Sequence, residues 1–274
     1  MTEKQIIDYV KKHPSQKVKL AITDMDGVLR GKYISTEKFL SAVNSNVAFC
    51  TIVFGWDSND AAYDNTEYTG WHNGYPDTPA KIDLKTFRKI PWENDVPFFL
   101  CELIGDKSYV CPRNLLKQVI SKSEDLGYKA YFSQEFEWFN FEETPQSIHD
   151  KKFKDLKHLS PGMFGYSILR TALQNDFFTA LFDDLKKFDI PLEGLHTETG
   201  PGVIEAAITY SDILEAADRA ILFKTGVKEI SYKQGIMATF MAKWSEALPG
   251  CSGHVHQSLW DKTSKTNLFY WSHF

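Results

Sequence analysis

Two glutamates in an aromatic segment, Glu135 and Glu137, are the residues whose type and spacing first suggest chemistry. They lie in Y-F-S-Q-E-F-E-W-F-N-F, residues 131–141, whose aromatic content favours a β-strand. Side chains two positions apart point to the same face of a strand, so the two carboxylates would lie side by side. Either they form a solvated acidic patch, or a bound divalent cation offsets two like charges in apolar surroundings.

A second pair of glutamates encloses a glycine-containing loop. Glu198 and Glu205 lie in H-T-E-T-G-P-G-V-I-E, residues 196–205. The glycines permit tight turns and close approach of the backbone, and Glu205 would begin the next strand. Taken alone, this pair is a weak indication of a site.

Histidines and a serine alternate in C-S-G-H-V-H-Q-S-L-W, residues 251–260. His254, His256 and Ser258 would share one face of a strand. A lone His-x-His pair is more commonly packed or hydrogen-bonded than bound to a metal ion. Four glutamates and one or two histidines together, however, suit Mg²⁺ or Mn²⁺, whereas zinc favours more Cys and His. Two such ions close together are a common clamp for phosphoryl transfer.

The first part of the chain, residues 1–105, is expected to be a small α+β unit. Alternating residues on both sides of Asp26-Gly27 predict a β-hairpin, on which Arg30 is either a ligand contact or a solvated charge. The other expected elements are a helix over 2–12, a strand over 47–56, an irregular stretch over 57–83, and strands near 88–91 and 98–104.

The second part, residues 106–274, contains every candidate side chain named above. Its apolar spacing predicts a helix on either side of the glutamate strand and then further strands. The expected helices cover 113–126, 168–188 and 212–235, the last possibly divided near Gly226. The expected strands cover 131–141, 203–208, 240–243 and 253–259.

Composition narrows the functional class. The 274 residues are 43% hydrophobic and 24% charged, as in ordinary globular proteins, and the net charge of −5 without a basic block argues against nucleic-acid binding. No apolar run reaches the roughly 18 residues of a membrane helix, and the first residues do not resemble a signal peptide. The four cysteines lack C-x-x-C spacing, so we expect reduced thiols in a cytoplasmic protein.

These motifs resemble the glutamine synthetase family, in the bacterial class I group that includes γ-glutamyl-polyamine synthetases. The resemblance covers nearly the whole chain. Its motifs stand in the family's order: D-M-D-G-V-L-R-G-K at 24–32, Y-P-D at 75–77, I-D-L-K-T at 82–86, I-P-W at 90–92, the Glu-x-Glu strand, the Glu-to-Glu loop, A-A-D-R at 216–219, A-T-F-M-A-K at 238–243 and G-H-V-H-Q-S-L at 253–259.

The resemblance implies an α+β fold with two domains. Residues 1–105 would form a β-grasp domain, and residues 106–274 a catalytic domain with a curved antiparallel sheet flanked by helices. The family's arginine-rich segment and its last carboxylate ligand of the second metal have no counterpart in the sequence, so we expect the catalytic domain to be incomplete at its C-terminal end.

The implied activity is ATP-dependent amide formation. Glutamate would be phosphorylated to γ-glutamyl phosphate, from which ammonia or another amine displaces phosphate. The implied cofactors are ATP and two or three Mg²⁺ or Mn²⁺ ions, and the full-length protein would be a dodecamer-like double ring. The alternatives are a catalytically silent relative that serves as a structural or binding protein and an unrelated metal-dependent phosphotransferase.

The resemblance also assigns roles to single residues. Glu137, Glu198 and Glu205 match the ligands of the first metal, and Glu135 and His254 match ligands of the second. Glu193, His256 and Ser258 match nucleotide contacts, Gly250 matches a backbone contact to glutamate, and Asp64 is similar to the aspartate that helps deprotonate ammonium in a neighbouring subunit's site. Val203 and Trp244 depart from the family's usual Gln and Pro.

Overall fold

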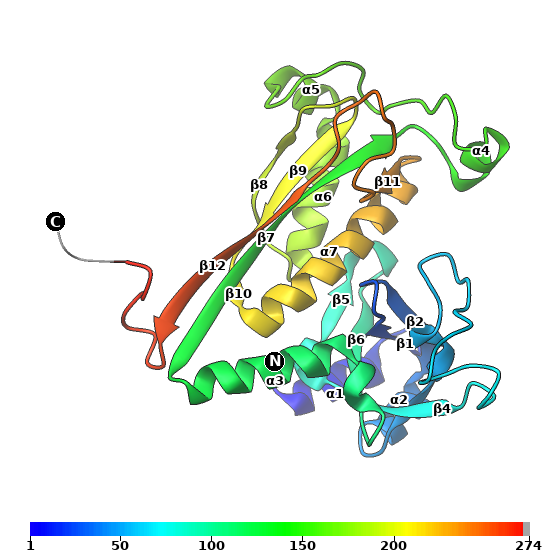
Figure 1. Ribbon diagram of the computed structural model, residues 1–274, viewed down its shortest axis with the longest axis vertical. Helices are drawn as coiled ribbons and strands as arrows, with labels where there is room; N and C mark the ends of the chain where they lie inside the picture. Colours follow the sequence, from blue (N-terminus) through cyan, green and yellow to red (C-terminus); the bar gives the residue numbers. More distant parts are fainter. Residues whose placement is uncertain (271–274) are drawn as a thin grey trace. The chain divides into compact units, whose positions relative to one another are not determined.

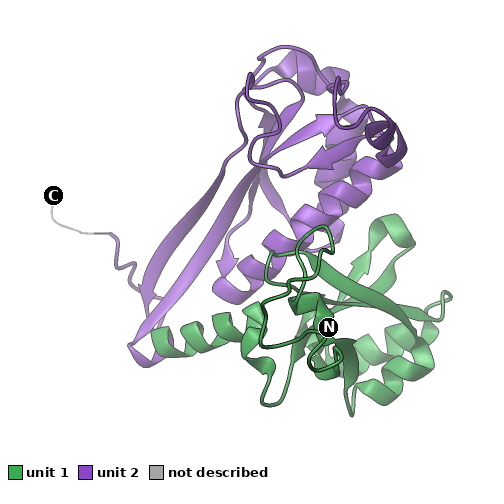
Figure 2. Ribbon diagram, turned by 45° about the vertical axis from the view of Figure 1, so that its right-hand side comes forward, with its two compact units in different colours: residues 1–123 green, residues 124–274 purple. Residues whose placement is uncertain are grey.

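The computed structural model describes residues 1–270, and the chain divides into two compact units, residues 1–123 and 124–274 (Figure 2). Each unit combines a β-sheet with helices, which confirms the predicted α+β class.

Unit 1 contains a six-stranded sheet in the order β2-β1-β6-β4-β3, with β5 also paired to β6. Strands β1 and β2 form the predicted antiparallel hairpin, and β1 pairs with β6 in parallel. The elements are α1 (Glu3–Lys12), β1 (Lys17–Thr23), β2 (Leu29–Ser35), α2 (Thr36–Ala42), β3 (Val47–Cys50), β4 (Asp77–Ile82), β5 (Arg88–Ile90), β6 (Val96–Leu103) and α3 (Pro112–Asp125), with 3₁₀ turns at Thr51–Phe54, Leu84–Thr86, Pro91–Glu93 and Ser108–Val110.

Two expected elements of unit 1 differ from the structure. The strand predicted over 47–56 ends at Cys50, where the chain turns into a 3₁₀ helix. The stretch predicted to be irregular, residues 57–83, contains a strand near its end, β4. The side chains of β4 alternate strictly between exposed and buried. Pro79 concealed this alternation, because proline inside a strand normally argues against pairing.

Arg30 anchors the long loop of unit 1 and is not a solvated charge, since its side chain is 15% exposed and paired with two carboxylates. Its guanidinium donates to Asp24 Oδ2 at 2.7 Å, to Asp60 Oδ1 at 2.5 Å and to the Asp57 carbonyl at 3.1 Å. The same group lies over the Trp56 ring. The hairpin and the loop that begins at residue 57 are thus held together by one side chain.

Unit 2 is built around one long strand, β7, in an antiparallel six-stranded sheet. Strand β7 pairs with both β9 and β12, and Figure 1 shows the three strands running alongside one another, with α7 beside them. The elements are β7 (Tyr128–Phe141), α4 (Pro145–Asp150), α5 (Ile168–Leu173), α6 (Asn175–Lys187), β8 (Leu192–Thr197), β9 (Val203–Ile208), β10 (Ser211–Asp212), α7 (Ile213–Lys233), β11 (Met237–Thr239) and β12 (Gly253–Asp261).

The two faces of β7 have different partners. On one face, the rings of Phe136 and Trp138 lie 5.6 and 5.7 Å from the ring of Phe223 on α7, which is fully buried. Glu135 and Glu137 are on the other face, as the two-residue period of a strand requires. Packing against α7 therefore determines which face of the sheet holds the carboxylates.

Two expected elements of unit 2 are placed differently, and the division suggested for a third is absent. The helix predicted over 168–188 is two helices, because Gln174 has φ −110° and ψ 26° and interrupts the first. The helix over 212–235 is continuous through Gly226, which is buried within α7. The strand expected over 240–243 lies slightly earlier, as β11.

A buried carboxylate fixes the connection that follows β7. Glu143 is 4% exposed and accepts hydrogen bonds from Ser147 Oγ at 2.6 Å and from the Lys157 backbone at 2.8 Å, and it pairs with Lys151. The bond from Lys151, with those from Ser147 and Lys157, lowers the pKa of Glu143 to about 2 from an ordinary 4.5. The folded state therefore prefers the ionised form of this carboxyl.

We expect Glu143→Gln to lower the free energy of unfolding by about 1–3 kcal/mol at pH 7, because charge-assisted bonds to a buried group are lost. A lowered folded-state pKa contributes stability above pH 4.5 that disappears as the pH falls towards 2. Urea unfolding at pH 7 and pH 3 measures this difference. Glu246→Gln, the same change at an exposed position, is the control, and an equal effect at both pH values would contradict the assignment.

Candidate active site

The carboxylates of unit 2 form a row across neighbouring strands. The sheet register places Glu205 of β9 opposite Glu137 of β7 and also opposite His196 of β8. On the other edge of β7, His254 of β12 is opposite Glu135. Residues opposite one another in antiparallel strands point to the same face. The row therefore lies on the face that α7 does not cover.

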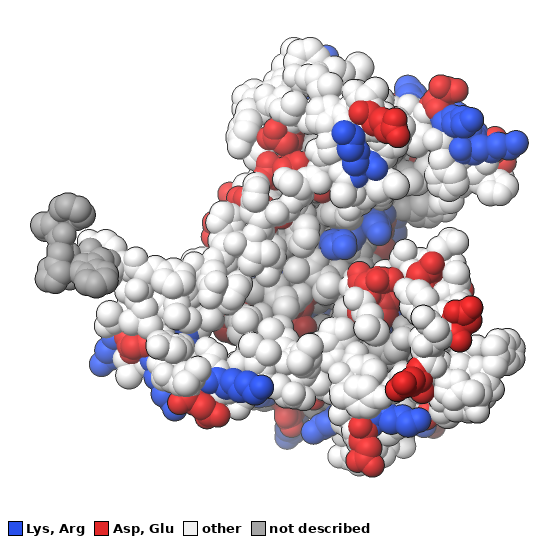
Figure 3. Space-filling model, viewed as in Figure 1, with Lys and Arg blue, Asp and Glu red and all other residues white. Residues whose placement is uncertain are grey.

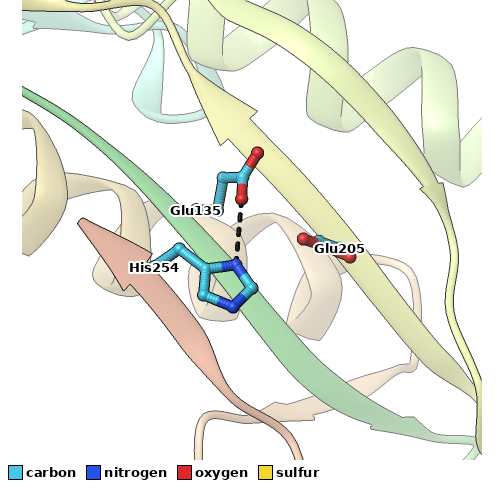
Figure 4. Close-up of side chains that lie close together, drawn as sticks. All are labelled: Glu135, Glu205 and His254. Atoms are coloured by element: carbon cyan, nitrogen blue, oxygen red, sulfur yellow. Dashed lines mark hydrogen bonds and ion pairs between the residues drawn. The ribbon is translucent and has the colours of Figure 1, made fainter. Parts of the chain in front are cut away.

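One close group consists of Glu135, Glu205 and His254, whose possible ligand atoms lie within 4.8 Å of one another. Figure 4 shows the three side chains together on one side of the strands. His254 Nδ1 lies 3.0 Å and His256 Nε2 lies 3.1 Å from the same oxygen, Glu135 Oε2. The hydrogen bond from His256, with a smaller one from His254, lowers the pKa of Glu135 below its ordinary value.

A second close group consists of His196, Glu198 and Glu205. His196 Nε2 is 3.7 Å from Glu205 Oε2, and its Nδ1 is 3.9 Å from Glu198 Oε2. The ring of Tyr166 stacks on the imidazole with centroids 4.0 Å apart. These separations exceed hydrogen-bond length, so no hydrogen bond joins His196 to either carboxylate.

Glu137 lies in neither group, as far as the described residues go. Ser252, immediately before β12, donates its backbone N–H to Glu137 Oε2 at 3.0 Å and its hydroxyl to Oε1 at 2.6 Å. The Glu137 N–H in turn donates to the Ser252 carbonyl at 3.1 Å. The structure therefore gives Glu137 a partner that the sequence did not suggest.

Glu205 is the electrostatically least favourable member of the row. Burial raises its pKa above the ordinary value, and the charges of Glu137, Glu135 and Glu198 raise it further, whereas His196 acts in the opposite direction. Its side chain is 13% exposed. A group of like charges with raised proton affinity is the arrangement that a bound cation stabilises.

The donor set fits hard divalent cations. Within residues 1–270, the ion pairs of Glu135, Glu198 and Glu205 are to histidines. No lysine or arginine is recorded as compensating their charge in that range. Carboxylate oxygens with one or two imidazoles suit Mg²⁺ or Mn²⁺, and Glu205 belongs to both groups.

A cavity of about 330 Å³ adjoins the row. Its lining includes all three predicted nucleotide contacts, Glu193, His256 and Ser258, together with Tyr131 and Tyr210. The rings of Tyr131 and Tyr210 pack edge to face with centroids 6.2 Å apart. The predicted nucleotide residues are therefore brought together, and they are accompanied by an aromatic wall of the kind on which a base can stack.

A buried asparagine braces the loop between Glu198 and Glu205. Asn140 is fully buried, accepts a hydrogen bond from Trp138 Nε1 at 2.9 Å and donates through Nδ2 to the Gly202 carbonyl at 3.0 Å. The Asn140 backbone N–H donates to the same carbonyl at 3.0 Å. The loop is thereby held to β7 at Gly202, immediately before β9 begins.

The two remaining predicted residues lie outside the row. Asp64 is exposed in the long loop of unit 1. Gly250 precedes β12, and a Cβ added there would lie 2.7 Å from the Ala242 carbonyl. Only glycine fits this position without movement of the backbone.

Sequence reasoning missed His196, although the signal was present. His196 is two residues before Glu198. It lies opposite Glu205 in the sheet and points to the same face. The i, i+2 argument used for Glu135 and Glu137 would have placed it in the site. Tyr131, Tyr210 and Ser252 gave no comparable signal, because their roles depend on pairing between distant segments.

Charged side chains elsewhere on the surface are of both signs. Figure 3 shows acidic and basic side chains interspersed over the face that it draws. Among the described residues, no helix is both long enough and apolar enough to cross a membrane.

Comparison with known proteins finds a matching family and relatives similar over nearly the whole chain. A family model described as "Glutamine synthetase, catalytic domain" matches residues 109–273. The chain is 52% identical over 270 residues to type-1 glutamine synthetase 2 of Dictyostelium discoideum, covering 97% of this chain and 52% of that protein. It is 39% identical over 266 residues to glutamate–isopropylamine ligase of a Pseudomonas species, covering 94% and 58%.

The fold is also similar to that of solved structures. A solved complex of GmaS with ADP superposes with a TM-score of 0.80 at 20% identity, covering 98% of this chain and 58% of that one. The chain spans about half the length of the curated relatives it matches.

Proposed function

This chain belongs to the glutamine synthetase family, and from that premise we propose that it is an ATP-dependent ligase that joins the γ-carboxylate of L-glutamate to ammonia or another amine. The observation that carries the proposal is the row of carboxylates and histidines beside a cavity lined by Glu193, His256 and Ser258. Its close relatives include a glutamine synthetase and a glutamate–isopropylamine ligase.

We assign the row to two or three Mg²⁺ or Mn²⁺ ions. Glu137, Glu198 and Glu205 would hold the first, and Glu135 and His254 the second. Such ions neutralise charge that develops on a transferring phosphoryl group and align nucleophile and leaving group. His196 adds a nitrogen donor beside the first site.

The nucleotide would occupy the adjoining cavity. Glu193, His256 and Ser258 offer polar groups, and Tyr131 and Tyr210 offer aromatic faces. Bound in this way, ATP would present its γ-phosphate to the carboxylate row. The γ-carboxylate of glutamate would attack that phosphorus, ADP would leave, and the amine would then displace phosphate from γ-glutamyl phosphate.

The acceptor amine would be deprotonated beside the row. A carboxylate-lined pocket favours a cationic amine and can accept its proton once water is excluded. Gly250 would contact glutamate through its backbone. Asp64 would assist deprotonation in a neighbouring subunit, which requires the parent protein to be a homo-oligomer.

The test is γ-glutamyl hydroxamate formation from L-glutamate, ATP and hydroxylamine, with Mg²⁺ or Mn²⁺, followed by a panel of amines. We expect product that requires all three substrates and the cation, and a lower turnover for Asp64→Ala. Binding of ATP and Mn²⁺ without product from any amine would overturn the ligase assignment in favour of a silent nucleotide-binding relative. Failure to bind either would overturn the nucleotide and metal assignments too.

A further inference from the structure

We propose that Ser252 is a positioning residue for Glu137, and that its hydroxyl sets the affinity of the adjacent cation site. The inference rests on the proposed function, because it concerns the divalent cation that the row would hold. Ser252 itself would contact neither substrate nor cation.

The contact between the two residues is reciprocal and uses both carboxylate oxygens. The Ser252 hydroxyl donates to Oε1 at 2.6 Å and its N–H donates to Oε2 at 3.0 Å, while the Glu137 N–H returns a bond to the Ser252 carbonyl. Two donors on two oxygens fix the torsion of the carboxylate plane, which a single bond would leave free. Each oxygen keeps a second lone pair for a cation.

Glu137 needs such support because another carboxylate lies opposite it in the sheet. Glu205 of β9 lies directly opposite Glu137, so two carboxylates face each other across this pair of strands and repel each other when both are ionised. Ser252 lies on the other edge of β7, since the strand that follows it, β12, pairs there. Its two donors therefore offset part of the charge of Glu137 and hold it against that repulsion.

The position of Ser252 gives the contact a second effect. Ser252 is the last residue before β12, on which His254 lies, and Gly250 is two residues upstream. The bonds to Glu137 thus tie the start of β12 to the centre of the sheet. A cation that orders Glu137 would also order the segment that carries Gly250.

The experiment titrates the purified protein with Mn²⁺ and measures the free ion by electron paramagnetic resonance. The wild type is compared with three variants, Ser252→Ala, Ser252→Thr and Ser245→Ala. Removing partners that orient a ligand typically weakens metal affinity about 10–100-fold, and we expect about tenfold for Ser252→Ala. Ser252→Thr keeps the hydroxyl and should restore the affinity. Ser245 is in the same loop and bonds only locally to the Ala247 N–H among its recorded contacts, so its replacement should change nothing.

The melting temperature without metal separates positioning from folding. We expect Ser252→Ala to melt like the wild type in EDTA and to show a smaller upward shift with Mn²⁺. Unchanged or tighter Mn²⁺ binding by Ser252→Ala, with normal binding by the wild type, would overturn this inference alone. A wild-type protein that binds no Mn²⁺ would overturn it together with the metal assignment of the proposed function.

Discussion

The Glu205→Gln protein is expected to lose at least about a hundredfold in the proposed ligase activity and yet to be more stable than the wild type when divalent cations are absent. Replacing residues that merely orient a metal ligand costs about 10–100-fold, so losing a ligand shared by both groups should cost at least as much. The gain in stability follows from the charge that the substitution removes.

The sign of that gain follows from the pKa of Glu205. Because burial and neighbouring carboxylates raise it in the folded state, the unfolded chain ionises more readily. Glu205 therefore subtracts stability once the pH rises above its ordinary value, and the amide does not. The advantage of Glu205→Gln without metal should be present at pH 7 and should vanish at pH values below the ordinary pKa of glutamate.

Thermal melting in EDTA and in Mn²⁺, at pH 7 and pH 4, measures both effects. Once the Mn²⁺ concentration exceeds the dissociation constant, the stability of the wild type should rise with the logarithm of that concentration. The stability of Glu205→Gln should rise much less. Glu246→Gln is the matched control on an exposed loop. A variant that melts like the wild type in EDTA and responds equally to Mn²⁺ would remove Glu205 from the cation site.

Gly202→Ala is expected to be the most destabilising single substitution in the loop between Glu198 and Glu205. Gly202 has φ +70°, and a Cβ there would lie 2.5 Å from the Asn140 carbonyl oxygen and 3.2 Å from the Leu159 nitrogen. Both neighbouring atoms belong to the backbone, so neither can rotate away from the added Cβ. We expect a loss of about 3 kcal/mol or more in the free energy of unfolding, from steric conflict added to left-handed strain.

Gly235→Ala separates those two causes. Gly235 has φ +71°, almost the same backbone conformation, but a Cβ there would have no neighbour within 4 Å. Its replacement should cost about 1 kcal/mol, the strain alone. Urea unfolding of both variants gives the difference, and equal losses would show that the contact with Asn140 does not constrain the loop. We also expect Gly202→Ala to weaken Mn²⁺ binding, because the loop holds two of the carboxylates.

The two-residue alternation of side chains along a strand was enough to predict which candidate residues share a face. Glu135 and Glu137, like His254 and His256, are two residues apart, and this spacing alone determines that each pair shares a face. The hairpin at Asp26-Gly27 followed from its turn residues for the same kind of local reason.

What the sequence could not supply was the register between strands. Which residue faces Glu205 depends on how β8, β9 and β7 align, and the opposition of His196 to Glu205 emerges only from that alignment. The bond from Ser252 to Glu137 spans 115 positions. The break at Gln174 is equally invisible to periodicity, because the apolar spacing continues through it while one residue leaves the helical conformation.

His254 and His256 are carried by a strand, β12, that within residues 1–270 is paired along its length on one edge only. Strand β12 pairs with β7 along its length, and among described residues the backbone bonds on its other side are near its end, at Leu259 and Asp261. Local opening of such a strand needs less free energy than opening of β7, which is paired on both edges. The cation proposed for Glu135 and His254 would therefore cross-link β12 to β7, and its binding energy to the closed state would be added to the opening free energy of β12.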